Sequence, residues 1–265
     1  MGRLSKLISL QWAFFRASLI ADLEFRLNAS IQAFNDVLWY LMQIIAFEAI
    51  YAQVAHLGTW GLAELRVFLG VLFTVDALYM VFFSRNIHEF SQKVTRGDLD
   101  LLLAKPVNSQ YLMSCQRMNT TFIFNFVLAL CWLFWSLNKL EGGMPWGSLP
   151  FLIVLIPMGL LIQYSCSFSF SALSLFTVRS EGMLQLSQMA FRLGMRPDNL
   201  YMPWVRYLVL LVIPTGLIAS VPTRLLLGPF DPALLAWMVI ATVGFLWISS
   251  LIWRRGLRFY ASAST

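Results

Sequence analysis

Charged residues are scarce in this chain, and their scarcity excludes an ordinary soluble domain. Asp, Glu, Lys and Arg make up 12% of the 265 residues, whereas 59% of the residues are hydrophobic. Soluble domains carry about 25% charged residues. A chain with half that share cannot cover its surface with polar groups, so we expect a polytopic membrane protein. The net charge of +6 is spread between apolar runs without a dense Lys/Arg patch, so we expect no nucleic-acid partner.

Residue patterns that carry covalent, metal or nucleotide chemistry are also missing. Cys115, Cys131 and Cys166 lie in or beside apolar runs and form no C-x-x-C pair, which favours small buried side chains over a disulfide or a metal site. His56 and His88 are far apart. The chain contains no G-x-x-x-x-G-K-[ST], G-x-S-x-G or H-E-x-x-H motif. We therefore expect a protein that is not an enzyme and that binds no cofactor or metal of its own.

Long apolar runs supply the expected architecture. A helix needs about 20 apolar residues to cross the hydrocarbon core of a membrane. Six runs of suitable length predict an all-α fold in which residues 1–265 form a single membrane domain. The expected spans are about 34–55, 66–84, 118–138, 149–176, 206–224 and 232–253.

The distribution of Lys and Arg predicts the orientation of these spans. Of the 19 basic residues, all except Arg66, Lys139 and Arg224 fall in the termini and in the loops after the second and fourth spans. Cytoplasmic loops carry the excess of Lys and Arg. Both termini are therefore expected to face the cytoplasm, and an even number of spans agrees with this. At the tail, Trp253, Tyr260 and neighbouring arginines are suited to contact with membrane lipids.

The N-terminal segment 1–30 carries apolar residues at helical spacing and includes Trp12 among basic residues. This pattern favours a helix that lies in the membrane interface. The alternative is that the segment simply extends the first span.

A polar segment, 85–106, follows the second span. Its apolar stripe predicts a helix that Gly97 ends, because glycine adopts the left-handed conformation at little cost. Asp98 is expected to cap a second short helix, Asp100 to interact with the dipole of its first turn, and Pro106 to end it. The expected product is an elbow of two short amphipathic helices lying flat under the membrane. The alternative is a solvated loop with incidental capping.

Residues 177–204 are expected to form the other large cytoplasmic loop. Ser180 can cap a helix that runs to about Leu193, and Gly194 and Pro197 are suited to stop it.

Acidic residues inside apolar spans indicate function by default. Glu48 lies toward the outer end of the first span, and Asp76 lies nearer the middle of the second. Asp76 can pair with another helix, line a substrate path or carry a proton, and Glu48 can reach the headgroups. Both residues are therefore candidates for a translocation path.

Several stretches of the chain together resemble one family. The stretch Arg96-Gly97-Asp98-Leu99-Asp100-Leu101-Leu102-Leu103-Ala104-Lys105-Pro106 is similar to the segment after the second helix in permease subunits of type-2 ATP-binding-cassette (ABC) exporters. The match is to the bacterial branch whose permeases are lone six-helix chains. The tail from Trp253 to Ala263, the stretch from Phe191 to Pro203, and Pro214 and Pro222 in the fifth span agree with it.

The resemblance implies a division of labour. Separate cytosolic nucleotide-binding ATPase subunits would bind ATP and Mg, and a second permease chain, identical or related, would complete the pore in the bacterial cytoplasmic membrane. The 85–106 elbow would be a cytoplasmic coupling helix that contacts the ATPases. The residues expected to mediate coupling are Arg96, Gly97, Asp98, Asp100, Lys105 and Pro106.

Two other functions stay open at this point. The chain can be an ion-coupled secondary transporter or channel that uses Asp76 and Glu48, or a membrane scaffold that transports nothing. No sequence motif identifies a substrate.

Overall fold

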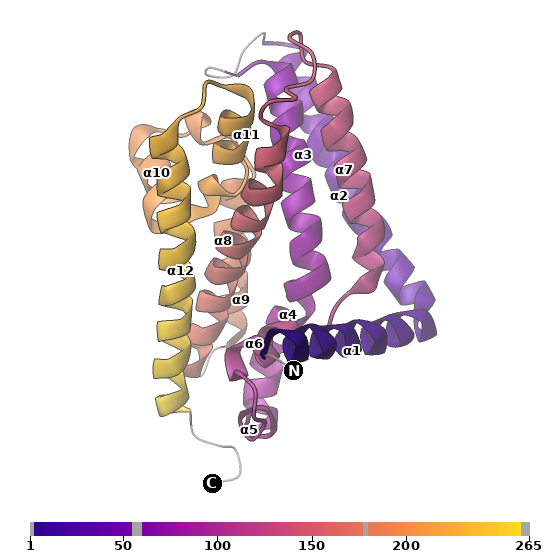
Figure 1. Ribbon diagram of the computed structural model, residues 1–265, viewed down its shortest axis with the longest axis vertical. Coiled ribbons are helices and arrows are strands. Elements are labelled where there is room, and N and C mark those ends of the chain that lie inside the picture. Colours follow the sequence, from indigo (N-terminus) through magenta and orange to yellow (C-terminus); the bar gives the residue numbers. More distant parts are fainter. Residues whose placement is uncertain (1–2, 55–59, 177–179, 261–265) are drawn as a thin grey trace.

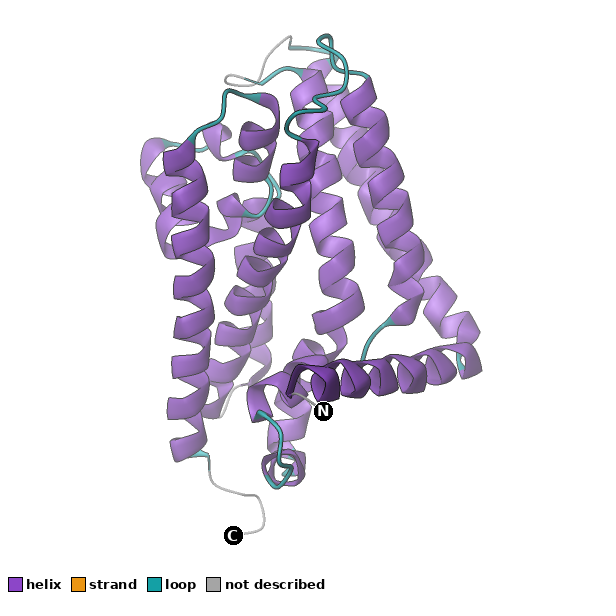
Figure 2. Ribbon diagram, in the orientation of Figure 1, coloured by secondary structure: helices purple, strands orange, loops and turns teal. Residues whose placement is uncertain are grey.

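The computed structural model describes residues 3–54, 60–176 and 180–260. Helices joined by short loops make up this part of the chain, and it contains no strand (Figure 2). The elements are α1 (Arg3–Glu24), α2 (Arg26–Tyr51), α3 (Leu62–Tyr79), the π-turn η1 (Met80–Ser84), α4 (Arg85–Thr95), α5 (Asp98–Leu103), α6 (Ser109–Cys115), η2 (Thr120–Phe122), α7 (Ile123–Asn138), η3 (Leu149–Phe151), α8 (Leu152–Leu173), η4 (Ser174–Phe176), α9 (Ser180–Gly194), η5 (Asp198–Leu200), α10 (Pro203–Tyr207), the π-turn η6 (Leu208–Val212), η7 (Pro214–Leu217), α11 (Ser220–Leu227) and α12 (Pro232–Phe259).

Five helical runs in the described ranges are long and apolar enough to cross a membrane, which confirms the all-α polytopic fold. They are Arg26–Tyr51, Leu62–Thr95, Thr120–Asn138, Leu149–Phe176 and Pro232–Phe259. A sixth span exists if Pro203–Val212 and Pro214–Leu227 count as one, although the two pieces are bent by 77°. This pair coincides with the expected span 206–224. The break follows from Pro214, because proline cannot donate the backbone hydrogen bond that a continuous helix needs.

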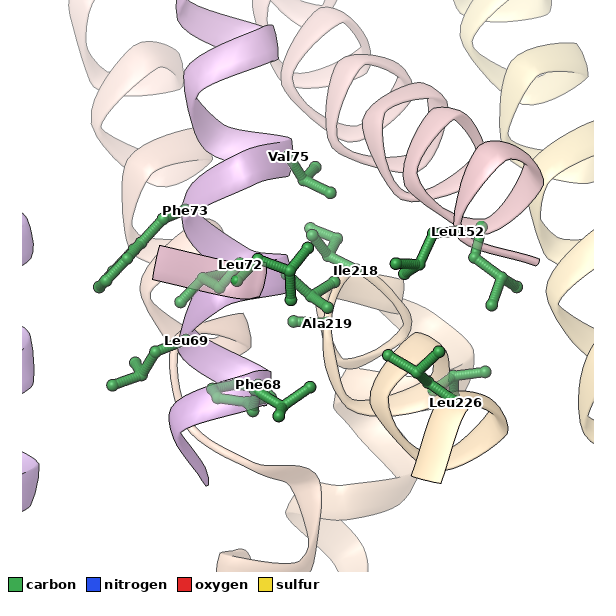
Figure 3. Packing of buried hydrophobic residues seen from close by; sticks show 14 of the residues in the cluster. Phe68, Leu69, Leu72, Phe73, Val75, Leu152, Ile218, Ala219 and Leu226 are labelled. Atoms are coloured by element: carbon green, nitrogen blue, oxygen red, sulfur yellow. The ribbon is translucent and has the colours of Figure 1, made fainter. Parts of the chain in front are cut away.

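The helix α3 occupies the centre of the bundle. Its apolar window is 78% buried, against 17% for α2 and 22% for α12. Phe68, Leu72 and Val75 of α3 meet Ile218 and Leu226 in the main apolar cluster (Figure 3). Close approach of the backbones makes this packing tight. A Cβ added at Gly70 would lie 2.8 Å from the Leu133 Cα on α7.

The end of the bundle at which α12 ends, here called the base, is crossed by α1 (Figure 1). This helix ends at Glu24, and α2 begins at Arg26 after Phe25 leaves helical geometry, so the flat helix is shorter than the expected 1–30. Asp22 ties α1 to the bundle. Its carboxylate pairs with Arg85 at 3.1 Å and accepts hydrogen bonds from the backbone N–H and hydroxyl of Thr120 at 2.8 and 2.7 Å.

The segment expected as the loop 177–204 is placed differently. The helix α9 lies against α8 and continues away from the base (Figure 1). Its last residue, Gly194, is so close to η7 that an added Cβ would lie 2.6 Å from the Thr215 carbonyl oxygen. The helix expected from Ser180 to about Leu193 is confirmed as α9, and its end packs against η7 rather than lying at the base. The helix is amphipathic: Ser187 and Ala190 are buried, whereas Gln185, Gln188 and Arg192 are exposed.

Candidate functional site

The elbow is the junction of α4 and α5, spanning residues 85–106. Gly97 adopts φ +78° between the two helices, as expected for a left-handed helix stop. The capping expectation is wrong in one detail. Gly97 itself occupies the N-cap position, and Asp98 is the first residue of α5 without a side-chain capping hydrogen bond. Asp98 and Asp100 instead place their carboxylates in the first turn, where the helix dipole favours negative charge.

The orientation of the elbow also differs from the expected flat arrangement. The helices α3 and α4 form one run from Leu62 to Thr95 through the π-turn η1. A π-turn inserts residues without ending a helix, and no sequence pattern of the segment 85–95 signals it. The elbow therefore projects from the base as an extension of the central helix, with α5 at its tip (Figure 1).

The inner face of the elbow is apolar and fully packed. Phe90 is 1% exposed, and its ring makes edge contacts with Phe168 of α8 and Trp253 of α12, each at 5.9 Å between centroids. Leu99 and Leu102 of α5 are buried in the same cluster. The elbow is thus joined to three long helices: α3 by the chain, and α8 and α12 by side-chain packing.

The tail of the chain also meets the elbow. Burial raises the pKa of the Tyr260 hydroxyl, and the negative charges of Asp100 and Asp98 raise it further. These carboxylates are therefore close enough to Tyr260 to act on it electrostatically.

The outer face of α5 carries large apolar side chains together with charged ones. Leu101 is 70% exposed and Leu103 is 39% exposed. Five of the predicted coupling residues are exposed around them, and Gly97 is half-buried; the five are Arg96, Asp98, Asp100, Lys105 and Pro106. Exposed leucines at the tip of a polar element are typical of a surface that contacts another protein.

Within the α4 part of the elbow, Glu89 organises a cluster of ion pairs. Its carboxylate pairs with Arg117 at 2.9 Å, Lys93 at 3.4 Å and Arg85 at 3.6 Å. Because Arg85 also pairs with Asp22, the cluster joins the elbow to α1. The elbow is therefore linked to neighbouring segments of the base by several ion pairs.

The two acidic residues expected in the translocation path lie apart in the structure. Glu48 makes a two-pronged ion pair with Arg66, at 2.6 and 2.9 Å, and the Arg66 guanidinium lies 5.6 Å from the Trp135 ring centroid. This group is at the end of the bundle opposite the base. Its paired geometry explains why an acid and a base occur here in apolar segments.

Asp76 lies in the interior and lines a cavity. Its side chain accepts hydrogen bonds from the Tyr40 hydroxyl at 3.2 Å and from the Gln163 amide at 3.4 Å. The cavity has a volume of about 260 Å³ and lies between α2, α3, α8 and α9. It shares Asp36, Trp39 and other lining residues with a second cavity of about 690 Å³ that extends to the base.

The structure contains one buried charged group that the sequence analysis does not predict. Asp198 is fully buried and forms ion pairs with Arg206, at 2.9 Å, and with Arg224. The three residues come from both sides of the 77° break, so they hold the bent segment together. Arg206 was expected at the base, but it lies beside Arg224. Only the spacing of an acid before two arginines in the sequence hinted at the group.

Comparison with known families decides the class of the chain. A family model described as "ABC-2 family transporter protein" matches residues 37–264. The chain belongs to the ABC-2 transporter family. The resemblance expected from the elbow and the tail is thereby confirmed, and the chain is a multi-pass permease of ABC transporters. No curated protein and no solved structure matches the chain.

The ABC-2 match covers the elbow, Asp76 and the Asp198 group, but neither α1 nor Asp36, which also lines the Asp76 cavity. The helix α1 thus lies outside the matched region, and Asp22 ties it to that region.

Proposed function

We propose that this ABC-2 permease moves a substrate out of the cell using ATP that a separate cytosolic subunit binds with Mg and hydrolyses. The observation that carries the proposal is the elbow, an exposed tip with a packed inner face. A partner bound to Leu101 and its neighbours can push on α5. The contacts of Phe90 then pass the displacement to α8 and α12.

The proposal requires the base to face the cytoplasm of a bacterial inner membrane. The distribution of basic residues supports this orientation even when those of α9 and α10, which lie away from the base, are left out. Basic residues of the elbow and of the end of α12 are gathered at the base, whereas Arg66 and Lys139 lie at the opposite end; the basal set includes Arg85, Lys93, Arg96, Lys105, Arg254, Arg255 and Arg258. An excess of Lys and Arg marks the cytoplasmic side.

A second permease chain, identical or related, is part of the proposal. The helix α2 leaves most of its surface uncovered, including Phe34, Leu38 and Met42. A partner helix or lipid can cover this face, and cross-linking from Met42→Cys distinguishes the two. A permease dimer predicts a covalent product of twice the chain mass in the membrane.

Co-purification tests the central part of the proposal. The tagged chain, expressed from its own chromosomal locus, is expected to elute with a nucleotide-binding subunit. Leu101→Glu places a carboxylate on the exposed face of α5 and is expected to abolish the association. The matched control is Trp146→Glu, because Trp146 is 75% exposed in the connection at the opposite end. Equal loss with both variants would count against the elbow as the docking surface.

An ion-coupled transporter is the second candidate, and the cavity that contains Asp76 is the observation that favours it. A tagged chain that brings down no nucleotide-binding subunit, but that supports substrate flux under an ion gradient in proteoliposomes, would establish this alternative. If the chain supports no substrate flux, the remaining candidate is a membrane scaffold that transports nothing.

A further inference from the structure

Two carboxylates share the cavity between α2, α3, α8 and α9. Asp36 of α2 and Asp76 of α3 both line it, and they are close enough to interact electrostatically. The Tyr40 hydroxyl donates to Asp76 at 3.2 Å and is also within hydrogen-bonding reach of Asp36. Asn125 donates to Asp36 at 2.8 Å. The pair is thus held by neutral donors from three helices.

Among the described residues, neither carboxylate forms an ion pair with Lys, Arg or His. Arg192 and His88 also line the cavity, but Arg192 is exposed and neither residue pairs with the acids. The His88 ring is hydrogen-bonded to the Ser84 carbonyl at 2.7 Å and lies 3.4 Å from Gln188. This contrasts with Glu48, Glu89 and Asp198, each of which has a cationic partner within 3 Å.

Two amide oxygens beside the carboxylates are also without partners. Gln163 is 3% exposed and lines the cavity; its Nε2 donates to Asp76, and its Oε1 has no hydrogen-bond donor. Asn125 is fully buried; its Nδ2 donates to Asp36 and to the Ala33 carbonyl, and its Oδ1 has no donor. A buried acceptor without a donor is energetically costly. Such atoms mark a place where a donor or a cation is needed.

From these observations we infer that the cavity is a binding site for a monovalent cationic group, held by Asp36, Asp76 and the Gln163 Oε1. The group is an alkali cation or the ammonium of an organic molecule, because carboxylate and amide oxygens coordinate an alkali cation and accept the N–H groups of an ammonium. Polar groups deep in a membrane are costly unless they are paired, so a site with two acids and orphan oxygens is suited to gain most from a cation.

The two cavities share lining residues, which supports a route from the base to the site. The larger cavity reaches from Asp22, Arg85 and Glu89 at the base to Asp36, where it meets the smaller one. A cation that enters there passes the carboxylates of Asp22 and Glu89 before it reaches Asp76. The inference goes beyond the proposed function, because binding at equilibrium requires neither an ATPase nor transport.

Direct binding tests the inference on the purified full-length chain. Radiolabelled Na⁺ and radiolabelled methylammonium are titrated separately in a scintillation proximity assay, each against its unlabelled form. Saturable binding of Na⁺ assigns the site to an alkali cation, saturable binding of methylammonium assigns it to an organic ammonium, and either result supports the inference. If neither probe binds saturably, the inference is overturned. A proton shared by the two carboxylates would then account for their burial without a cationic partner.

Substitutions in the cavity test whether the cation binds there. Asp76→Asn keeps the size of the side chain and removes its charge, and it is expected to weaken binding about tenfold or more. Gln163→Leu removes the orphan oxygen and leaves both carboxylates, so it keeps the test decisive if Asp76→Asn does not fold. The control is Glu141→Gln, because Glu141 is exposed in the connection at the opposite end and is expected to leave binding unchanged. Binding equal to that of the unmodified chain in both cavity variants would contradict the assignment.

Discussion

Removing the Phe90 ring is expected to disconnect the elbow from the membrane helices. Phe90 is 1% exposed and packs against Phe168 and Trp253. Replacement of a buried Phe by Ala costs about 3–5 kcal/mol of folding free energy. Within that sum, each edge-to-face ring contact contributes about 0.5–1.5 kcal/mol. Phe90→Ala should therefore lower the thermal stability of the purified protein and leave a cavity between α4, α8 and α12.

The functional consequence is a loss of transmission rather than of hydrolysis. In the complex with its ATPase, Phe90→Ala should still hydrolyse ATP, but α5 should move without carrying α8 and α12. The readout is a cysteine at Ser187, which lines the Asp76 cavity, in a chain whose native cysteines are replaced by serine. Its rate of reaction with a maleimide is expected to differ between nucleotide-free and ATP-vanadate states. Phe90→Ala should abolish that difference.

A matched variant separates transmission from stability. Phe68 is fully buried in the other apolar cluster, with its ring 5.6 Å from that of Trp60. Phe68→Ala should cost a similar free energy and preserve the nucleotide-dependent change in labelling. The reasoning is refuted if Phe90→Ala retains the full change, or if both variants lose it in proportion to their loss of stability.

Three further substitutions test the geometry, each by thermal unfolding in detergent. Gly97→Val should destabilise the chain by about 1–2 kcal/mol because of the left-handed backbone, and Gly97→Asn should cost less; equal costs would contradict the observed φ. Asp198→Ala should cost about 3–5 kcal/mol because it leaves two arginines without a buried counter-charge, whereas Asp231→Ala, which removes an N-cap, should cost about 1 kcal/mol. Gly70→Ala should destabilise the chain by forcing α3 away from α7, and Gly244→Ala, where an added Cβ meets nothing within 4 Å, should not; the reverse order would exclude the tight packing.

Local signals predicted the features that depend on local chemistry. Six apolar runs indicated the polytopic fold, and Gly97 indicated the helix stop, because a positive φ is a property of the residue itself. The cap was assigned to Asp98 because acids are good N-caps, but the glycine that ends α4 also starts α5. Gly97 both ends α4 and occupies the N-cap of α5, and capping preferences do not predict that one residue does both.

Features that depend on tertiary contacts could not be predicted. Glu48 has its partner Arg66 on another helix, and Asp76 has its hydrogen-bond donors Tyr40 and Gln163 on two others. The packing of α9 along α8 could not be predicted, because Arg192 and its polar neighbours are typical of a solvated loop. The Asp198 group was hidden because its arginines come from both sides of a break that the prolines mark but whose angle they do not determine.

The most direct test of the account is the location of Leu101 relative to a nucleotide-binding subunit. Leu101→Cys, in the chain without native cysteines, is expected to form a cross-link to that subunit in intact cells and to resist a membrane-impermeant maleimide added from outside. Labelling of this cysteine from outside the cell, or a failure to cross-link under conditions in which the two subunits co-purify, would contradict the central claim that the elbow is the cytoplasmic contact of an ATP-driven permease.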